Sequence, residues 1–182
     1  TPSTSSAASD VYKRQILGFM ITAAVISMWV MNTATTIMLL PIGLAVITVV
    51  KETVKDTSTQ ELNSFQLALL LGIAYGATIG GMSTLIGTGP NGMLAAFMAD
   101  NYDLDISFID WMKVGVPLSC VMLPGCWFIL TKVIFKVNFE TSSATKDLLI
   151  KMKNELGNLS SNEMKVLIVF VLTALAWMLR TL

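Results

Sequence analysis

The sequence predicts an all-α polytopic membrane protein that contains a re-entrant helical hairpin and a broken transmembrane helix. Of its 182 residues, 54% are apolar and 13% are charged, about half the charged share of soluble domains. The charges gather in a few clusters, and the uncharged stretches between them are long enough to cross a bilayer. Two of these stretches are too long for one simple span. We therefore expect lipid to solvate most of the chain.

The composition also excludes several classes of function. Twelve basic residues balance twelve acidic residues, so the chain lacks the positive excess that binds nucleic acid. It contains no histidine, and its two cysteines, Cys120 and Cys126, stand in an apolar run. Zinc sites, Cys-His nucleophiles and disulfide frameworks are therefore excluded. We expect neither an enzyme nor an organic cofactor.

We expect residues 1–15 to be a non-native tail. They are rich in Ser, Thr and Ala and lack the basic start and cleavage site of a signal peptide. Residues 10–15, Asp-Val-Tyr-Lys-Arg-Gln, resemble the translation of an adapter used in sequencing libraries. The last apolar run, 166–179, is shorter than the roughly 20 residues that span a bilayer. We expect a fragment of a longer membrane protein.

Uncharged stretch 16–50 predicts the re-entrant hairpin. It is too long for one crossing and shorter than two crossings with a turn. The run Asn32-Thr33-Ala34-Thr35-Thr36 interrupts it with polar side chains. We expect two half-length helices that meet at this polar tip, with both ends on the cytoplasmic side. The alternative is a polar packing face within an ordinary helix bundle.

Uncharged stretch 62–99 predicts the broken helix. Seven of the seventeen residues from Gly76 to Gly92 are Gly or Pro, which cost about 1 and 3 kcal/mol relative to alanine in a helix interior. We expect this segment to unwind and to share a polar site with the hairpin tip, because unwound backbone in a membrane needs partners. The alternative is that Gly76 and Gly80 are small-residue contacts between helices.

The positions of the charges predict the orientation. Lysine excess marks the cytoplasmic side, so segments 51–61 and 132–165 lie inside, and the aspartate-rich segment 100–113 lies outside. Segment 132–165 is a solvated loop or a helix on the membrane surface. The expected order is a hairpin over 16–50, a cytoplasmic connection over 51–61, a broken transmembrane helix over 62–99, an extracytoplasmic connection over 100–113, a transmembrane helix over 114–131, a cytoplasmic interfacial segment over 132–165 and the start of a truncated transmembrane helix over 166–182.

Paired broken segments are typical of the midplane binding site of a secondary transporter. Free carbonyls with Asn and Ser oxygens suit Na⁺, and helix N-termini with hydroxyl or amide donors suit carboxylates. Neither segment contains Lys or Arg, so a bound anion would depend on dipoles and co-bound cations. The alternatives are an ion channel with a re-entrant filter and a membrane subunit without transport activity.

Two motifs resemble one transporter family. Residues 27–41 resemble the first Ser-Asn-Thr signature of the divalent anion:sodium symporter (DASS) family, the sodium-coupled dicarboxylate and citrate carriers, and residues 74–91 resemble its next unwound segment. The resemblance covers residues 16–182. It implies the N-terminal repeat of an inverted-repeat carrier that works by alternating access, in the bacterial inner membrane and as a homodimer when full length.

The resemblance also implies the cargo and the site. The cargo would be Na⁺ with succinate, malate, fumarate or a related divalent anion. The alternatives of the same fold are a sodium-independent dicarboxylate exchanger and a sulfate carrier. Ser27, Asn32 and the Gly80 carbonyl would bind sodium, and Asn32 and Thr33 would contact a substrate carboxylate. Met31 departs from the family's usual serine, and a thioether is a poor ligand for a hard cation. The residues expected to support the site loop are Gly81, Thr84, Gly87, Thr88, Pro90 and Asn91.

Overall fold

The protein is helical over the part of the chain that the structure describes. A computed structural model describes residues 2–53, 58–135 and 160–179, and it confirms the all-α class. In chain order the helices are α1 (Pro2–Ser27), α2 (Asn32–Thr53), α3 (Thr59–Gly81), α4 (Gly89–Tyr102), α5 (Phe108–Phe128), the π-helix η1 (Ile129–Ile134) that continues α5, and α7 (Ser161–Leu179).

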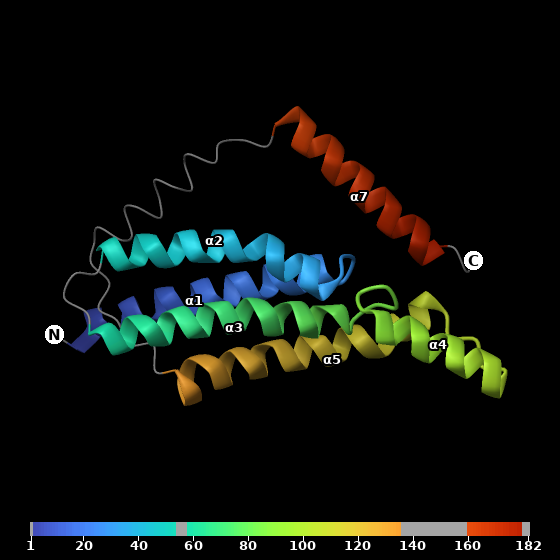
Figure 1. Ribbon diagram of the computed structural model, residues 1–182, viewed down its shortest axis with the longest axis horizontal. Helices are drawn as coiled ribbons and strands as arrows, with labels where there is room; N and C mark the ends of the chain where they lie inside the picture. The colour runs from blue at the N-terminus through green and yellow to red at the C-terminus, as the bar shows by residue number, and fades with distance from the viewer. Residues whose placement is uncertain (1, 54–57, 136–159, 180–182) are drawn as a thin grey trace.

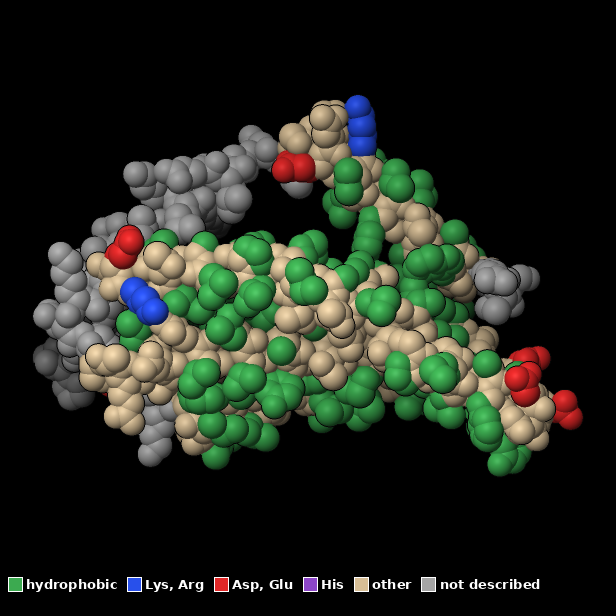
Figure 2. Space-filling model, in the orientation of Figure 1, with side chains coloured by type: hydrophobic (Ala, Val, Ile, Leu, Met, Phe, Trp, Pro, Cys, Tyr) green, Lys and Arg blue, Asp and Glu red, His purple; other side chains and the backbone are tan. Residues whose placement is uncertain are grey.

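Four of the described helical stretches are long and apolar enough to cross a membrane. Figure 2 shows hydrophobic side chains along these helices, and acidic side chains at the end of the molecule where α4 lies. This pattern agrees with a polytopic membrane protein. The four candidate spans are Asn32–Glu52, Thr59–Gly81, Phe108–Ile134 and Ser161–Leu179.

The core lies between α1, α2 and α3. These helices lie side by side with α5 in Figure 1, and α4 extends beyond the end of α3. Ile16 and Met20 of α1 are fully buried against a cluster that includes Phe65 and Leu69 of α3. Each such side chain contributes about 1.5–3 kcal/mol on burial from water; in a bilayer, close packing provides the stabilisation instead.

Small residues let α1 and α3 approach closely. A Cβ at Gly76 would lie 2.7 Å from the Met20 carbonyl oxygen, and one at Gly80 would overlap the backbone of Ala24. The structure therefore contains the small-residue contact that is the alternative explanation for these glycines. The same helix nevertheless ends at Gly81, within the glycine-rich segment.

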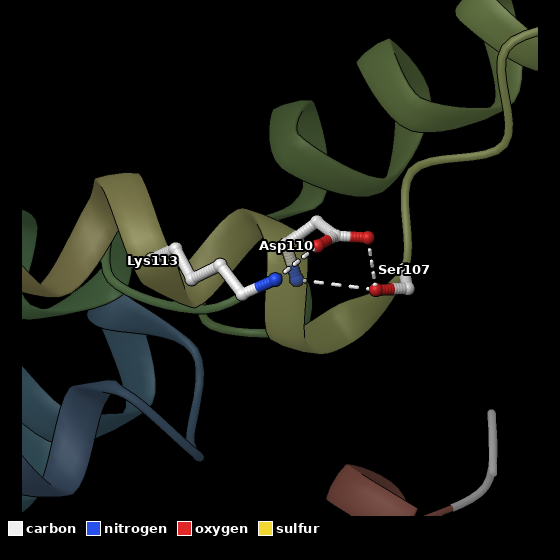
Figure 3. A network of polar contacts seen from close by, with 3 residues as sticks. All are labelled: Ser107, Asp110 and Lys113. Atoms are coloured by element: carbon white, nitrogen blue, oxygen red, sulfur yellow. Dashed lines mark hydrogen bonds and ion pairs between the residues drawn. The ribbon is translucent and has the colours of Figure 1, made fainter.

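Helix boundaries lie at capping residues and differ from those drawn from charge. At the start of α5, the Ser107 hydroxyl accepts from the Asp110 N–H at 3.1 Å, and Lys113 donates to the Asp110 carboxylate at 2.7 Å (Figure 3). α7 likewise begins beside Ser160, whose hydroxyl accepts from the N–H of Glu163 at 3.2 Å. Charged first turns therefore belong to the helices, because carboxylates favour helix N-termini.

Two expected lengths are wrong. α2 has 22 residues and is about 33 Å long at 1.5 Å per residue, so it is not a half-length helix. Pro41 lies inside α2 instead of ending it, as neighbouring groups permit in membrane helices. The last helix begins at Ser161, not within 166–182, and is long enough to span.

The expected tail is continuous with α1. This helix runs without a break from Pro2 past residue 15, and the Trp127 indole donates to the Lys13 carbonyl at 2.8 Å. The non-native origin of residues 1–15 stays a prediction. Most of the expected interfacial segment, residues 136–159, lies outside the described residues.

Candidate functional site

The loop between α1 and α2 lies against the loop between α3 and α4. Thr84, which is fully buried, donates from its hydroxyl to the Met28 carbonyl of the first loop. The same hydroxyl accepts from the N–H of Gly87 at 3.1 Å. The Thr84 side chain thus forms hydrogen bonds with both loops, which are more than fifty residues apart in the sequence. The two loops are therefore in contact, and their identity as the tip of a re-entrant hairpin and the break of a transmembrane helix stays a prediction.

Asn32, the first residue of α2, occupies the junction between these loops. Its side-chain amide lies next to three oxygens: Ser27 Oγ at 2.8 Å, Gly87 O at 3.2 Å and Ala77 O at 3.3 Å. With its nitrogen towards them, the amide donates to these oxygens. With its oxygen towards them, it completes a group of four neutral oxygens, the ligand type that hard cations prefer.

The site has no room for a larger residue at the end of α3. A Cβ on Gly81 would overlap the Asn32 amide. Ser27 is fully buried, and Ala77 is as well. The oxygens that surround Asn32 are therefore shielded from bulk solvent. Electrostatic interactions at such a buried site are stronger than in water.

The Gly80 carbonyl, which is expected to bind sodium, accepts a hydrogen bond from the loop that follows α3. The donor is the Ser83 N–H, at 2.9 Å. The carbonyls that lie next to Asn32 belong to Ala77 and Gly87. Sequence reasoning missed these two because every residue has a carbonyl, and only the path of the backbone decides where it points.

Asn91 organises the loop between α3 and α4. Its amide nitrogen donates to the Gly81 carbonyl at 3.0 Å and to the Thr84 carbonyl at 2.8 Å, and its side chain is buried. Pro90 lies in the first turn of α4, where its missing N–H removes no helical hydrogen bond. Thr88 precedes α4 in an extended conformation and does not cap it through its side chain.

The first turn of α2 is exposed on the side that faces away from the buried oxygens around Asn32. Thr33 is exposed in the first turn, and the first backbone hydrogen bond runs from the Thr35 N–H to the Met31 carbonyl. Met31 is 62% exposed, and its thioether cannot cap the helix as a hydroxyl would. The first N–H groups of α2 therefore provide the partial positive charge that favours an anion.

Helix α5 contributes two residues that are not among the predicted site residues, Trp111 and Ser119. The Trp111 indole donates to the Met82 carbonyl at 2.9 Å. The Ser119 hydroxyl donates to the Ile79 carbonyl at 2.8 Å and accepts from Ser83 Oγ at 2.8 Å. Their spacing of eight residues places both on one face of a helix, but only the fold identifies what that face contacts.

The chain is similar to one transporter family model and to curated transporters from two bacterial species. The family model described as "Citrate transporter" matches residues 4–182. The sodium-dependent dicarboxylate transporter SdcS of Staphylococcus saprophyticus is 40% identical over 168 residues, which cover 92% of this chain and 32% of that protein. SdcS of Staphylococcus aureus strain USA300 is 36% identical over 166 residues, which cover 91% of this chain and 32% of that protein. The chain thus spans about a third of the length of these curated relatives.

Proposed function

Because this chain belongs to the citrate transporter family, we propose that it forms part of a sodium-coupled carrier of C4-dicarboxylates or related divalent anions. The observation that carries the proposal is the placement of Asn32, whose amide lies 2.8–3.3 Å from three buried oxygens where two helix interruptions meet. The sodium-dependent dicarboxylate transporters that resemble the chain support the choice of ion and anion.

The membrane arrangement belongs to the same proposal. α1 and α2 form a re-entrant hairpin, the loop between α3 and α4 interrupts a membrane helix, and the junction of the hairpin tip with this loop lies within the membrane. The chain forms part of the N-terminal one of two inverted repeats in a bacterial plasma-membrane carrier, which is a homodimer when full length. The lysine-rich side faces the cytoplasm.

Sodium binds among the neutral oxygens at the junction. Ser27 and Asn32 provide side-chain oxygens, and the Ala77 and Gly87 carbonyls, which lie 3.3 and 3.2 Å from the amide, provide backbone oxygens. Gly80 contributes its carbonyl from the end of α3, since a carbonyl oxygen that accepts one hydrogen bond keeps a second lone pair. Hard oxygen ligands without net charge match a monovalent alkali cation.

The dicarboxylate binds at the exposed side of the same junction. The hydroxyl of Thr33, the amide of Asn32 and the first N–H groups of α2 donate to one carboxylate. Neither loop carries Lys or Arg, so the sodium ion supplies the neighbouring positive charge. Anion binding is stronger once sodium occupies the adjacent site, and this mutual dependence couples the two fluxes.

The direction of transport follows from electrical work. Importing a dianion against about 100 mV, inside negative, costs roughly 4.6 kcal/mol. More than two sodium ions per dianion make import electrically favourable. Alternating access of the fixed site to the two sides of the membrane then moves both cargoes.

Uptake by the full-length carrier that contains this chain tests the proposal. Purified protein is reconstituted into proteoliposomes, and uptake of labelled succinate is measured with an inward sodium gradient and with choline replacing sodium. We expect saturable uptake that requires sodium. Saturable uptake that is indifferent to sodium would overturn the coupling and indicate an exchanger, preference for sulfate would overturn the substrate class, and non-saturating conductance would indicate a channel.

A further inference from the structure

The interruption between α3 and α4 releases carbonyl groups that need partners. The last turn of a helix leaves its carbonyls without intrahelical donors, and in a membrane each unsatisfied group costs several kcal/mol. Here the Ala77 carbonyl lies next to Asn32 on the side of the hairpin tip, and the Ile79 and Met82 carbonyls lie against α5 on the other side. Figure 1 shows α5 running alongside α3 as far as this loop.

Side chains from outside α3 satisfy four of these carbonyls. Asn91 of α4 donates to two, those of Gly81 and Thr84. Helix α5 donates to the other two, through Ser119 to Ile79 and through Trp111 to Met82. The four bonds are 2.8–3.0 Å long, which is good hydrogen-bond geometry.

Backbone packing reinforces the contact with α5. Gly115 lies between Trp111 and Ser119 on the same helix face. A Cβ at Gly115 would lie 2.8 Å from both the Met82 and the Ser83 carbonyl oxygens. Only glycine lets the loop approach this closely. Trp111, Gly115 and Ser119 together form a surface that we call the α5 seat.

Packing alone does not explain why the α5 seat has a buried hydroxyl, that of Ser119, against the hydroxyl of Ser83. Ser119 is 8% exposed and Ser83 is 2% exposed. Both line an apolar cavity of about 440 Å³ whose other walls include Leu17, Val116 and Leu123. A buried hydroxyl in such surroundings is costly unless it is hydrogen-bonded, and an alanine would fill the helix contact without that cost.

We infer that the α5 seat positions the end of α3 and the loop that follows it, so that the Ala77 carbonyl of α3 and the Gly87 carbonyl of the loop face the cation site. Its donors engage the Ile79 and Met82 carbonyls and hold them away from Asn32. Ser119 and Trp111 are thus positioning residues for sodium affinity, although neither touches the ion. This inference rests on the proposed sodium coupling and adds to it the helix that determines the backbone ligands.

Conservative variants of the full-length carrier test the role of Ser119. Ser119→Cys keeps the size but weakens the donor, and Ser119→Thr keeps the hydroxyl. We expect the half-saturating sodium concentration to be about tenfold higher in Ser119→Cys than in the wild type, the effect of losing one buried hydrogen bond. In Ser119→Thr, which keeps the donor, it should stay within about twofold of the wild type. The matched control is Ser64→Ala, which removes an exposed hydroxyl that donates to its own helix.

Trp111→Phe provides a second, independent variant. It removes the indole donor and keeps an aromatic ring, so we expect the same rise in half-saturating sodium. Its control is Trp177→Phe in α7, where the side chain is 42% exposed. Sodium-dependent thermal stabilisation of the detergent-solubilised protein should shift in parallel, and the succinate KM at saturating sodium should stay within about twofold of the wild type.

The outcomes separate the two proposals. A wild-type carrier whose uptake ignores sodium overturns the proposed function and the inference with it. A sodium-dependent wild type, with unchanged half-saturation in both Ser119→Cys and Trp111→Phe, overturns the inference alone. A fall in maximal rate or in melting temperature without a shift in sodium dependence also contradicts it, because such a fall indicates a structural role only.

Discussion

Replacement of Asn32 by alanine should remove most of the affinity for sodium. The amide makes one short contact, 2.8 Å to Ser27 Oγ, and two longer ones, 3.2 Å to the Gly87 carbonyl and 3.3 Å to the Ala77 carbonyl. With its oxygen towards this group, the amide is one of four neutral oxygens of the proposed sodium site, and alanine removes it. A polar contact to a charged group contributes about 1.5–3 kcal/mol, so the loss is about 2 kcal/mol, or roughly 30-fold in a binding constant.

The assay is sodium-dependent succinate uptake by the full-length carrier in proteoliposomes. Half-saturating sodium should rise by at least about 30-fold, and the succinate KM should rise as well, because the same amide is proposed to donate to the anion. The control is Asn63→Ala, which truncates an exposed asparagine at the start of α3. A folded Asn32→Ala protein with half-saturating sodium and succinate KM both within about threefold of the wild type would refute the assignment of the site.

Three further substitutions probe the same region. Thr84→Val removes the hydroxyl that joins the two loops, so half-saturating sodium should rise about tenfold in uptake assays; an unchanged value contradicts the role of this hydroxyl. Gly80→Ala places a methyl group on the Ala24 backbone, whereas Gly18→Ala meets nothing within 4 Å. Only the first should reduce the yield of monodisperse protein on size-exclusion chromatography, and equal yields would disprove the close contact. Met31→Ser adds a hydroxyl at the start of α2, and sodium titrations should show severalfold tighter binding; unchanged affinity means that position 31 provides no side-chain ligand.

The location of the junction could be predicted from local sequence. Glycine and proline lower helix propensity, and their density between Gly76 and Gly92 predicts the break after Gly81, whereas the isolated Pro41 stays inside α2. The polar run that begins at Asn32 could be recognised in the same way, because polar side chains in an uncharged apolar stretch require partners. Asn91 was expected to support the loop, but its donation to two carbonyls at once depends on the path of the loop.

Helix lengths were less predictable. The expectation of two half-length helices treats the polar run as the end of both, yet α2 starts at Asn32 and continues past Pro41. Likewise, boundaries drawn at charged residues exclude Asp110 and Glu163 from helices that in fact begin just before them. The reason is that a helix continues to its capping residue, whatever the charge of its first turn.

The sequence by itself determined that this is a helical membrane protein with two interruptions, and that these interruptions should share a polar site without fixed positive charge. These properties depend on hydropathy and on the intrinsic cost of glycine, proline and polar groups, which act locally. Only the tertiary structure decided which oxygens meet. Ala77 has its role because α3 packs beside the start of α2, and Gly87 has its role because the backbone leaves α3 in a particular direction. Both arrangements depend on contacts between residues far apart in the chain.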